Sequence, residues 1–133
     1  MTPRIAALAN LRILVVEDEV IIVMMLEDIL EEYGCIVEVA PSIERAVESL
    51  RARPPDGVLL DMNIHGTIPL AVAEELVQRS VPFLMVTGYA AGDGDPDIIK
   101  TAPRLQKPFH EDELGRRMVE VFGDHSKHAA GTV

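Results

Sequence analysis

Five side chains that can bind ions or exchange protons come directly after apolar or strand-like runs of the sequence: Glu17, Asp18, Asp61, Thr87 and Lys107. Apolar runs of this length are typical of strands in a parallel sheet. The carboxyl ends of such strands line one edge, about 4.8 Å apart, and ligands bind there where the strand order reverses. We therefore expect these side chains to face one another across one crevice. Three carboxylates placed side by side repel one another, and their oxygens suit a bridging divalent cation such as Mg²⁺.

Strand and helix patterns alternate along the chain. The predicted strands cover residues 12–16, 36–39, 57–60, 83–86 and 104–106, and the predicted helices cover about 19–33, 43–51, 68–79 and 111–122. Gly34 is placed to end the first helix and Ser42 to cap the second. Between residues 88 and 103 Gly, Asp and Pro are too frequent for a regular helix, so the fourth helix is expected to be displaced, missing or limited to 97–101. Five βα units with right-handed crossovers predict a three-layer α/β/α sandwich.

Length and composition indicate one α/β domain, with residues 1–10 as a loose or helical lead-in and 123–133 as a frayed tail. The chain has 133 residues and is 48% apolar but only 4% aromatic, which predicts an aliphatic core. A formal net charge of -10 argues against a nucleic-acid-binding surface. The longest apolar stretch, 20–26, is too short to span a bilayer, and no signal-peptide layout is present, so we expect a cytoplasmic protein without membrane attachment. The single cysteine, Cys35, excludes an internal disulfide and is expected to be an inert core thiol.

Four segments resemble, in order and spacing, the receiver domain of two-component response regulators: Val15–Glu19, Leu59–Asn63, Val86–Gly88 and Gln106–Phe109. The resemblance covers about residues 11–122 and implies a (βα)5 flavodoxin-like sandwich with the parallel strand order 2-1-3-4-5. It further implies a single-domain bacterial response regulator. Such a protein is not an enzyme beyond its own phosphotransfer and autodephosphorylation, and its output is contact with another protein. The likeness extends in part to stand-alone receivers nicknamed for a Phe-Ala-Thr-Gly-x-Tyr motif, the FAT GUY subset.

The resemblance implies a role for each candidate residue. Asp61 is the expected phosphoacceptor, taking a phosphoryl group from the phosphohistidine of a histidine kinase or a histidine phosphotransfer protein. Asp18 and Asp61 are expected to bind Mg²⁺ directly, with the backbone carbonyl of Asn63, while Glu17 acts mostly through water. Two further side chains are expected to contact the phosphoryl group: Thr87 through its hydroxyl and Lys107 through its ammonium.

The sequence also departs from the family pattern. His65 stands where most receivers carry a proline, and Arg104 replaces the aromatic residue whose inward swing reports phosphorylation. Tyr89 is a candidate substitute for that aromatic residue, or a shield over the acyl phosphate. The Lys107–Pro108 bond resembles the cis peptide of the family.

The first helix is apolar all round in its first half. The family register places one set of side chains inward, Ile22, Met25, Leu26, Ile29 and Leu30, and another towards the surface, Val20, Val23 and Met24. The outward set suits a docking surface for the helical bundle of a kinase or for another receiver, and equally a hydrophobic cap over the core. A homodimer is left open.

Three other functions compete with this interpretation. A degenerate receiver would bind partners constitutively without phosphorylation, and His65, Arg104 and the disrupted fourth helix favour it. An aspartyl-phosphate phosphatase generally needs a second acid two residues after the nucleophile, where Asn63 stands. A flavodoxin-like cofactor binder needs a phosphate loop after the first strand, where Glu17 and Asp18 would repel a phosphate. His65 as a metal ligand, and a metal pair formed by His125 and His128, are the less favoured interpretations of those histidines.

Overall fold

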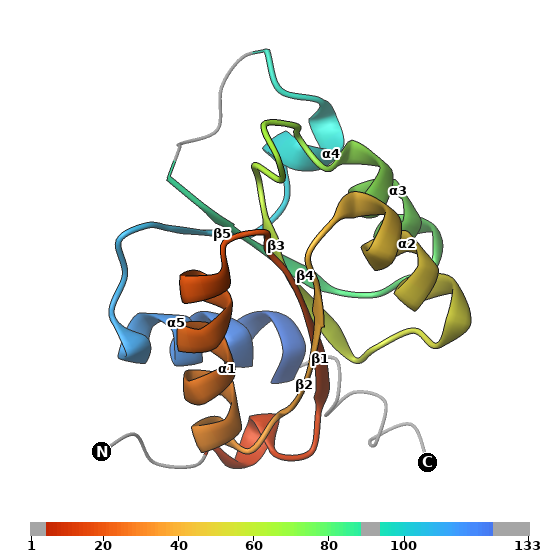
Figure 1. Ribbon diagram of the computed structural model, residues 1–133. Coiled ribbons are helices and arrows are strands. Elements are labelled where there is room, and N and C mark those ends of the chain that lie inside the picture. Colours follow the sequence, from red (N-terminus) through yellow and green to blue (C-terminus); the bar gives the residue numbers. More distant parts are fainter. Residues whose placement is uncertain (1–4, 89–93, 124–133) are drawn as a thin grey trace.

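The computed structural model describes residues 5–88 and 94–123. Its centre is one parallel sheet of five strands: β1 Arg12–Val16, β2 Ile36–Ala40, β3 Gly57–Asp61, β4 Phe83–Thr87 and β5 Arg104–Gln106. The strand order is β2-β1-β3-β4-β5 (Figure 1). This topology confirms the predicted fold. It also places the reversal of strand order between β1 and β3, where the crevice was expected.

Helices cover both faces of the sheet. They are α1 Val20–Tyr33, α2 Ile43–Ala52, α3 Leu70–Gln78, α4 Asp97–Lys100 and α5 Glu111–Met118, with a 3₁₀ turn η1 at Ala6–Leu8 and a π-helical turn η2 at Val119–Gly123. Helices α1 and α5 lie on one face, and α2, α3 and α4 lie on the other (Figure 1). Two clusters of buried residues match these two interfaces, one for each face of the sheet.

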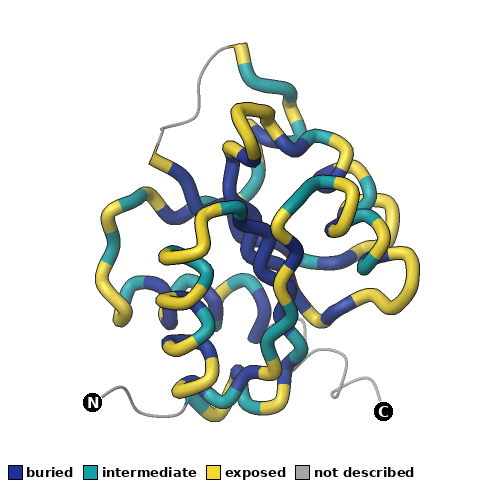
Figure 2. Tube along the Cα trace, viewed as in Figure 1, coloured by how far each residue is buried: buried dark blue, intermediate teal, exposed yellow. Residues whose placement is uncertain are grey.

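The three central strands of the sheet, β1, β3 and β4, are buried almost along their whole length, whereas the edge strands β2 and β5 are partly exposed. Every residue of β3 and β4 is buried, and so is every residue of β1 except Arg12 (Figure 2). A strand covered by helices on both faces needs apolar side chains on both sides, which explains the continuous apolar runs in the sequence. These rigid strands hold the side chains at their carboxyl ends.

Local signals in the sequence fix two helix ends as predicted. Gly34 follows α1 with a φ of 98°, a left-handed conformation that glycine adopts without a steric penalty. The Ser42 hydroxyl accepts a hydrogen bond of 3.2 Å from the Arg45 N–H at the start of α2. The short α4 also agrees with the expected disruption of the fourth helix.

Helix α3 begins two residues later than the expected Ile68. Ile64 and Thr67 exchange two backbone hydrogen bonds of 2.9 and 3.0 Å and so form a tight antiparallel turn. The two residues between them, His65 and Gly66, have φ values of 51° and 81°. Positive φ at both central positions defines a primed hairpin turn, a conformation that the His-Gly pair did not reveal in the sequence.

The lead-in was expected to be loose or helical, and its described part is helical, because Ala6–Leu8 form the turn η1. Leu8 is fully buried and the Asn10 N–H donates to the Gly34 carbonyl at 2.8 Å, so this segment packs against the rest of the domain. Helix α5 ends at Met118, and the turn η2 continues it to Gly123. The expected frayed tail otherwise lies outside the described residues.

Helix α1 follows much of its predicted orientation, but Ile22, expected inside, and Val23, expected at the surface, are both partly buried. Leu26, Ile29 and Leu30 are buried as expected, and Val20 is 71% exposed. Met25 was expected to face inward, and this prediction is wrong because its side chain is 44% exposed. It borders a hollow between α1 and the segment after β5, and none of the described elements covers it. Within the described residues, no helix is long and apolar enough to cross a membrane.

Candidate functional site

The carboxyl ends of β1 and β3 bring three acidic side chains together. Oxygen atoms of Glu17, Asp18 and Asp61 lie within 4.8 Å of one another. A cleft of about 360 Å³ opens at this edge of the sheet, and it is lined by Asp18, Glu19, Asp61, Asn63, Gly66, Gly88 and Lys107. The cleft therefore lies where the strand order predicted a ligand site.

Lys107 brings a positive charge to the acidic cluster. Its Nζ atom lies 3.4 Å from Glu17 Oε1 and 3.8 Å from Asp61 Oδ2. Its backbone N–H donates to the Thr87 carbonyl at 2.7 Å, which fixes the start of the segment after β5 against the end of β4. The Lys107–Pro108 peptide bond is cis, as predicted. One ammonium thus faces two carboxylates, which leaves the cluster with excess negative charge.

Glu17 is the most buried of the three acids, and only 2% of the residue is exposed. Its Oε2 atom accepts hydrogen bonds from the N–H groups of Asp18 and Glu19 at 3.0 and 3.2 Å, just before α1 begins. Burial, followed by the hydrogen bond and the repulsion from Asp61, raises the pKa of Glu17 from 4.5 to about 7. The fold therefore holds this carboxylate where its negative charge is unfavourable without a cation.

Asp18 is tied to the turn after β3. The His65 N–H donates to Asp18 Oδ2 at 3.0 Å, and His65 Nδ1 lies 3.4 Å from the same oxygen. Burial opposes ionisation of Asp18, but this hydrogen bond and further ones from its surroundings outweigh it and lower the pKa of the carboxyl. His65 therefore contributes a backbone hydrogen bond to the site. The sequence analysis noted only that His65 stands where most receivers carry a proline, and it did not suggest this contact.

Asp61 ends β3 at the floor of the cleft. It is 8% exposed, and its Oδ1 atom accepts a hydrogen bond of 3.2 Å from the Asn63 N–H. The other oxygen, Oδ2, is the one nearest to Lys107. The two oxygens therefore have different surroundings, with one held by the backbone and one directed towards the charged side of the cleft.

Thr87 ends β4 beside Asp61 and is 1% exposed. Its Oγ1 atom lies 3.6 Å from the sulfur of Met62 with the geometry of a hydrogen bond. Met62 is a residue that the sequence analysis did not identify. The only signal for Met62 in the sequence was its position directly after Asp61. This signal is weak, because methionine is an adaptable residue that commonly fills gaps in a core.

Two further candidates among the described residues, Arg104 and Cys35, are not part of the cleft lining. Arg104, at the position of the missing aromatic residue, donates from Nη2 to the Ile99 carbonyl of α4 at 3.0 Å. Cys35 is buried as expected, and burial raises the pKa of its thiol to about 11. The candidates Tyr89, His125 and His128 lie outside the described residues.

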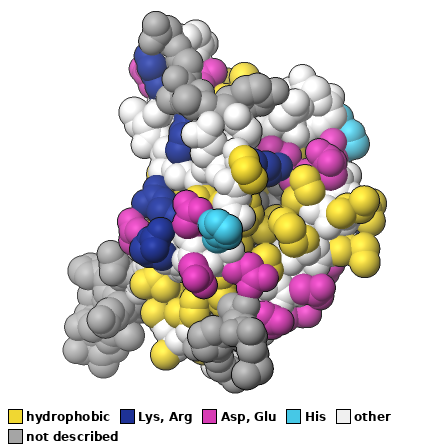
Figure 3. Space-filling view, turned by 90° about the vertical axis from the view of Figure 1, so that its left-hand side faces the viewer, with side chains coloured by type: hydrophobic (Ala, Val, Ile, Leu, Met, Phe, Trp, Pro, Cys, Tyr) yellow, Lys and Arg dark blue, Asp and Glu magenta, His cyan; other side chains and the backbone are white. Residues whose placement is uncertain are grey.

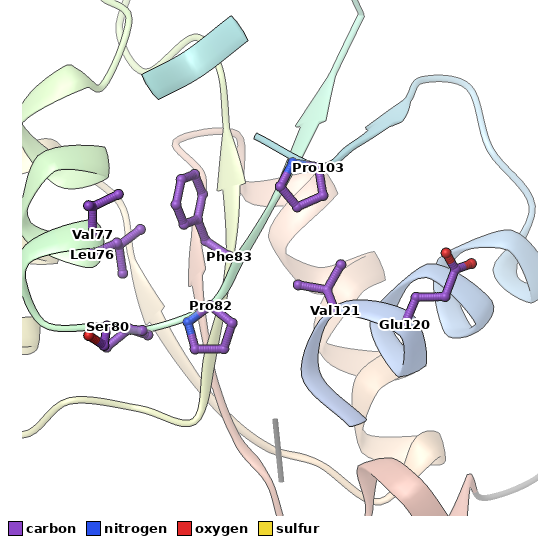
Figure 4. A pocket seen from close by; sticks show the side chains of 9 residues that line it. Leu76, Val77, Ser80, Pro82, Phe83, Pro103, Glu120 and Val121 are labelled. Carbon is purple, nitrogen blue, oxygen red and sulfur yellow. The ribbon is translucent and has the colours of Figure 1, made fainter. Parts of the chain in front are cut away.

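Two apolar hollows accompany the cleft. One of about 430 Å³ shares Lys107 with it and is otherwise lined by Ile22, Met25, Pro108 and Phe109. On the face that carries α1 and α5, hydrophobic side chains gather beside acidic ones (Figure 3). The other hollow, of about 520 Å³, lies at the opposite end of β4, between α3 and η2 (Figure 4). Its polar side chains are Ser80 and Glu120, a set without the carboxylate cluster of the cleft.

Two curated proteins are similar to this chain in sequence. The chain is 34% identical over 122 residues to the protein-glutamate methylesterase/protein-glutamine glutaminase 1 of Anaeromyxobacter dehalogenans, covering 83% of this chain and 34% of that protein. It is 30% identical over 109 residues to the transcriptional regulatory protein ZraR of Escherichia coli O157:H7, covering 79% of this chain and 25% of that protein. The chain thus spans about a quarter to a third of the length of these curated relatives.

Solved structures share the fold. The receiver domain of sensor histidine kinase PA1611 from Pseudomonas aeruginosa, which holds a magnesium ion in its active-site cleft, has a TM-score of 0.76 and 25% identity and covers 86% of this chain and 99% of that one. The receiver domain of the response regulator PhyR from Erythrobacter litoralis has a TM-score of 0.73 and 25% identity, covering 86% and 92%. The family model for the response regulator receiver domain matches residues 13–118 of this chain, from β1 to the end of α5. The chain therefore belongs to the response regulator receiver domain family.

Proposed function

We propose that residues 11–122 form a receiver domain that accepts a phosphoryl group on Asp61 from the phosphohistidine of a histidine kinase or a histidine phosphotransfer protein. The observation that carries this proposal is the convergence of Asp61 with two further acids and Lys107 in one cleft. Phosphoryl transfer needs positioning and charge stabilisation more than covalent assistance from the protein. A carboxylate nucleophile beside an ammonium and a cation site meets this need.

The acidic cluster fits a magnesium ion. Two buried carboxylates, Glu17 and Asp61, face a single ammonium, and hard oxygen donors are the ligands that Mg²⁺ prefers. We assign direct binding to Asp18, Asp61 and the backbone carbonyl of Asn63, with Glu17 acting mostly through water. A bound Mg²⁺ would neutralise charge on the phosphoryl oxygens during transfer.

The phosphoryl transfer needs no reactant other than Asp61 and the donor phosphohistidine. The Asp61 carboxylate attacks phosphorus, so that an O–P bond forms while the P–N bond to the donor histidine breaks. The electron pair of that bond returns to the imidazole nitrogen, which takes up a proton. Lys107 then pairs with the phosphoryl oxygens, and the Thr87 hydroxyl donates a hydrogen bond to one of them. Later attack by water on phosphorus breaks the bond between phosphorus and the Asp61 oxygen, releases inorganic phosphate and returns Asp61 to its free carboxylate.

An exposed apolar surface beside the cleft supports a protein partner for this domain. Val20, Ile21 and Met24 are exposed on α1 next to the acidic cluster, and Met25 borders the apolar hollow that shares Lys107 with the cleft. Such a surface suits the apolar face of a helical donor that presents a phosphohistidine, and it equally suits a second receiver. We propose that signal output is a protein contact that changes when Asp61 is phosphorylated.

Incubation with acetyl phosphate, with and without Mg²⁺, tests the proposal by intact mass. The expected result is a gain of one phosphoryl group in Mg²⁺ that hydroxylamine removes and that Asp61→Asn abolishes. Asp28→Asn, which removes an exposed carboxylate from α1, is the matched control and should gain the group normally. A gain that persists in Asp61→Asn would refute the assignment of the acceptor.

One alternative has an observation in its favour. Arg104 occupies the position of the usual aromatic switch and is bound to α4 through the Ile99 carbonyl, which suits a receiver that binds partners constitutively. No phosphoryl gain from acetyl phosphate and none from a kinase-generated phosphohistidine donor would favour this degenerate receiver over the phosphoacceptor.

A further inference from the structure

Met62 and Thr87 contact each other at the ends of neighbouring strands. Asp61 of β3 pairs with Val86 of β4, so Met62 and Thr87 each follow that pair by one residue. Both side chains are buried, with exposed fractions of 6% and 1%, and the Thr87 Oγ1 atom lies 3.6 Å from the Met62 sulfur. Met62 also belongs to the core cluster on the face of α2, α3 and α4. The contact between Met62 and Thr87 is therefore part of the packed interior of the domain.

A thioether is a weak hydrogen-bond acceptor, whereas a phosphoryl oxygen is charged and accepts strongly. The Thr87 hydroxyl has a single hydrogen to donate. A hydroxyl that donates to the Met62 sulfur must give up this contact when it donates to a phosphoryl group on Asp61. The two hydrogen bonds therefore belong to two states of the site, and the Met62 contact belongs to the unphosphorylated one.

We propose that Met62 is a positioning residue, whose sulfur holds the Thr87 hydroxyl in the unphosphorylated state and so opposes its turn towards the phosphoryl group. The inference rests on the proposed function, because it assigns Thr87 to a phosphoryl group on Asp61. The long, flexible side chain of methionine lets the sulfur leave the hydroxyl without opening a cavity. A weak acceptor at this position keeps the resting state ordered at a small cost to phosphorylation.

The test measures the affinity of the metal-loaded protein for beryllofluoride, a phosphoryl mimic, in a Met62→Leu variant. Leucine keeps the apolar volume and removes the acceptor. Loss of one neutral hydrogen bond from the resting state should tighten binding about two- to five-fold. Met85→Leu is the matched control, because Met85 is fully buried in the same cluster, and its affinity should equal that of the unmodified protein.

A second background separates positioning from packing. In a Thr87→Val protein no hydroxyl is left to hold, so adding Met62→Leu should not change the affinity for beryllofluoride. The methyl resonance of Met62 should also shift when beryllofluoride binds to the unmodified protein, and this shift should shrink in Thr87→Val. Equal tightening in both backgrounds, or none in either, would overturn the role of Met62.

The design keeps this inference distinct from the proposed function. An unmodified protein that neither binds beryllofluoride nor gains a phosphoryl group has failed the proposed function, and the inference falls with it. An unmodified protein that binds, with Met62→Leu binding equally, fails the inference alone. Met62→Ile serves as a second variant if Met62→Leu does not fold, and the methyl resonance of the unmodified protein decides if neither variant folds.

Discussion

Replacing Asp61 with Asn should stabilise the metal-free protein at alkaline pH, although it removes the proposed acceptor. The reason is the raised pKa of Glu17, which burial and then Asp61 move from 4.5 to about 7. The folded protein binds this proton more tightly than the unfolded chain does. The corresponding stability is fully present below pH 4.5 and is lost as the pH rises through 7, and the whole difference corresponds to about 3 kcal/mol.

The share that Asp61 contributes sets the size of the effect. Burial is the largest cause of the raised pKa, and it remains in Asp61→Asn, so we expect the variant to recover about 1 kcal/mol at pH 8. This gain corresponds to an increase of about 4 °C in the unfolding temperature of a domain of this size. The amide oxygen of Asn can still accept the hydrogen bond that the Asn63 N–H donates to Asp61.

Urea denaturation in the presence of a chelator measures this effect. The gain should appear at pH 8 and nearly vanish at pH 5, where Glu17 is protonated in the folded protein. Mg²⁺ should then stabilise the unmodified protein more than Asp61→Asn, because it binds the folded state of an intact acidic cluster. Asp28→Asn controls for the change in net charge. A variant that is less stable at pH 8, gains equally at both pH values, or matches Asp28→Asn would refute the reasoning.

Three further predictions concern the core. Tyr33 donates to the Glu111 carbonyl, so Tyr33→Phe should lower the free energy of unfolding by about 1 kcal/mol in urea denaturation. Burial raises the pKa of Tyr33 to about 12, so its contribution is complete below pH 10 and is lost as the pH rises towards 12, a loss that Tyr33→Phe should remove. A Cβ at Gly57 would lie 2.5 Å from the Phe122 ring, so Gly57→Ala should cost about 1 to 3 kcal/mol. Iodoacetamide should modify Cys35 slowly in the folded protein and rapidly in urea, as intact mass would show, because the thiol is buried and its pKa is about 11.

Each of these predictions has a control. Gly94→Ala should leave stability nearly unchanged, because its Cβ would meet no atom within 4 Å, and adding Phe122→Leu to Gly57→Ala should recover part of the loss. An alkaline loss of stability that is the same with and without the Tyr33 hydroxyl would contradict the assignment of its pKa. Equal rates of Cys35 alkylation in the folded and denatured protein would show that the thiol is accessible.

The sequence predicted the sheet because its central strands are buried on both faces. Continuous apolar runs such as 57–60 leave few other structures open, and the alternation with helices then determines the connections. The residues placed at the strand ends also converge in the structure, since parallel strands deliver their carboxyl ends to one edge. That much of the candidate site followed from Glu17, Asp61 and Lys107 in the sequence.

The details that failed depend on tertiary contacts. Met25 lies on the side of α1 that the helical register assigned to the core, but no element in the described part of the chain covers it. A periodic pattern cannot show where a neighbouring loop ends. The turn at His65 and Gly66 has no strong turn signature, so α3 was expected to start too early. The contact between Met62 and Thr87 joins two strands and has no signal in either local sequence.

Helix α4 gives the fold a mechanically compliant side. Four residues are too few for a cooperative helix, so the position of α4 depends on tethers and not on its own hydrogen-bond ladder. One tether is the buried side chain of Ile99, which is worth about 1.5 to 3 kcal/mol, and another is the hydrogen bond from Arg104 to the Ile99 carbonyl, worth about 1 kcal/mol. Displacing α4 therefore means withdrawing the Ile99 side chain from its core cluster, breaking the Arg104 hydrogen bond and losing the partly buried packing of Ile98 and Ala102, but it does not require a long helix to unwind.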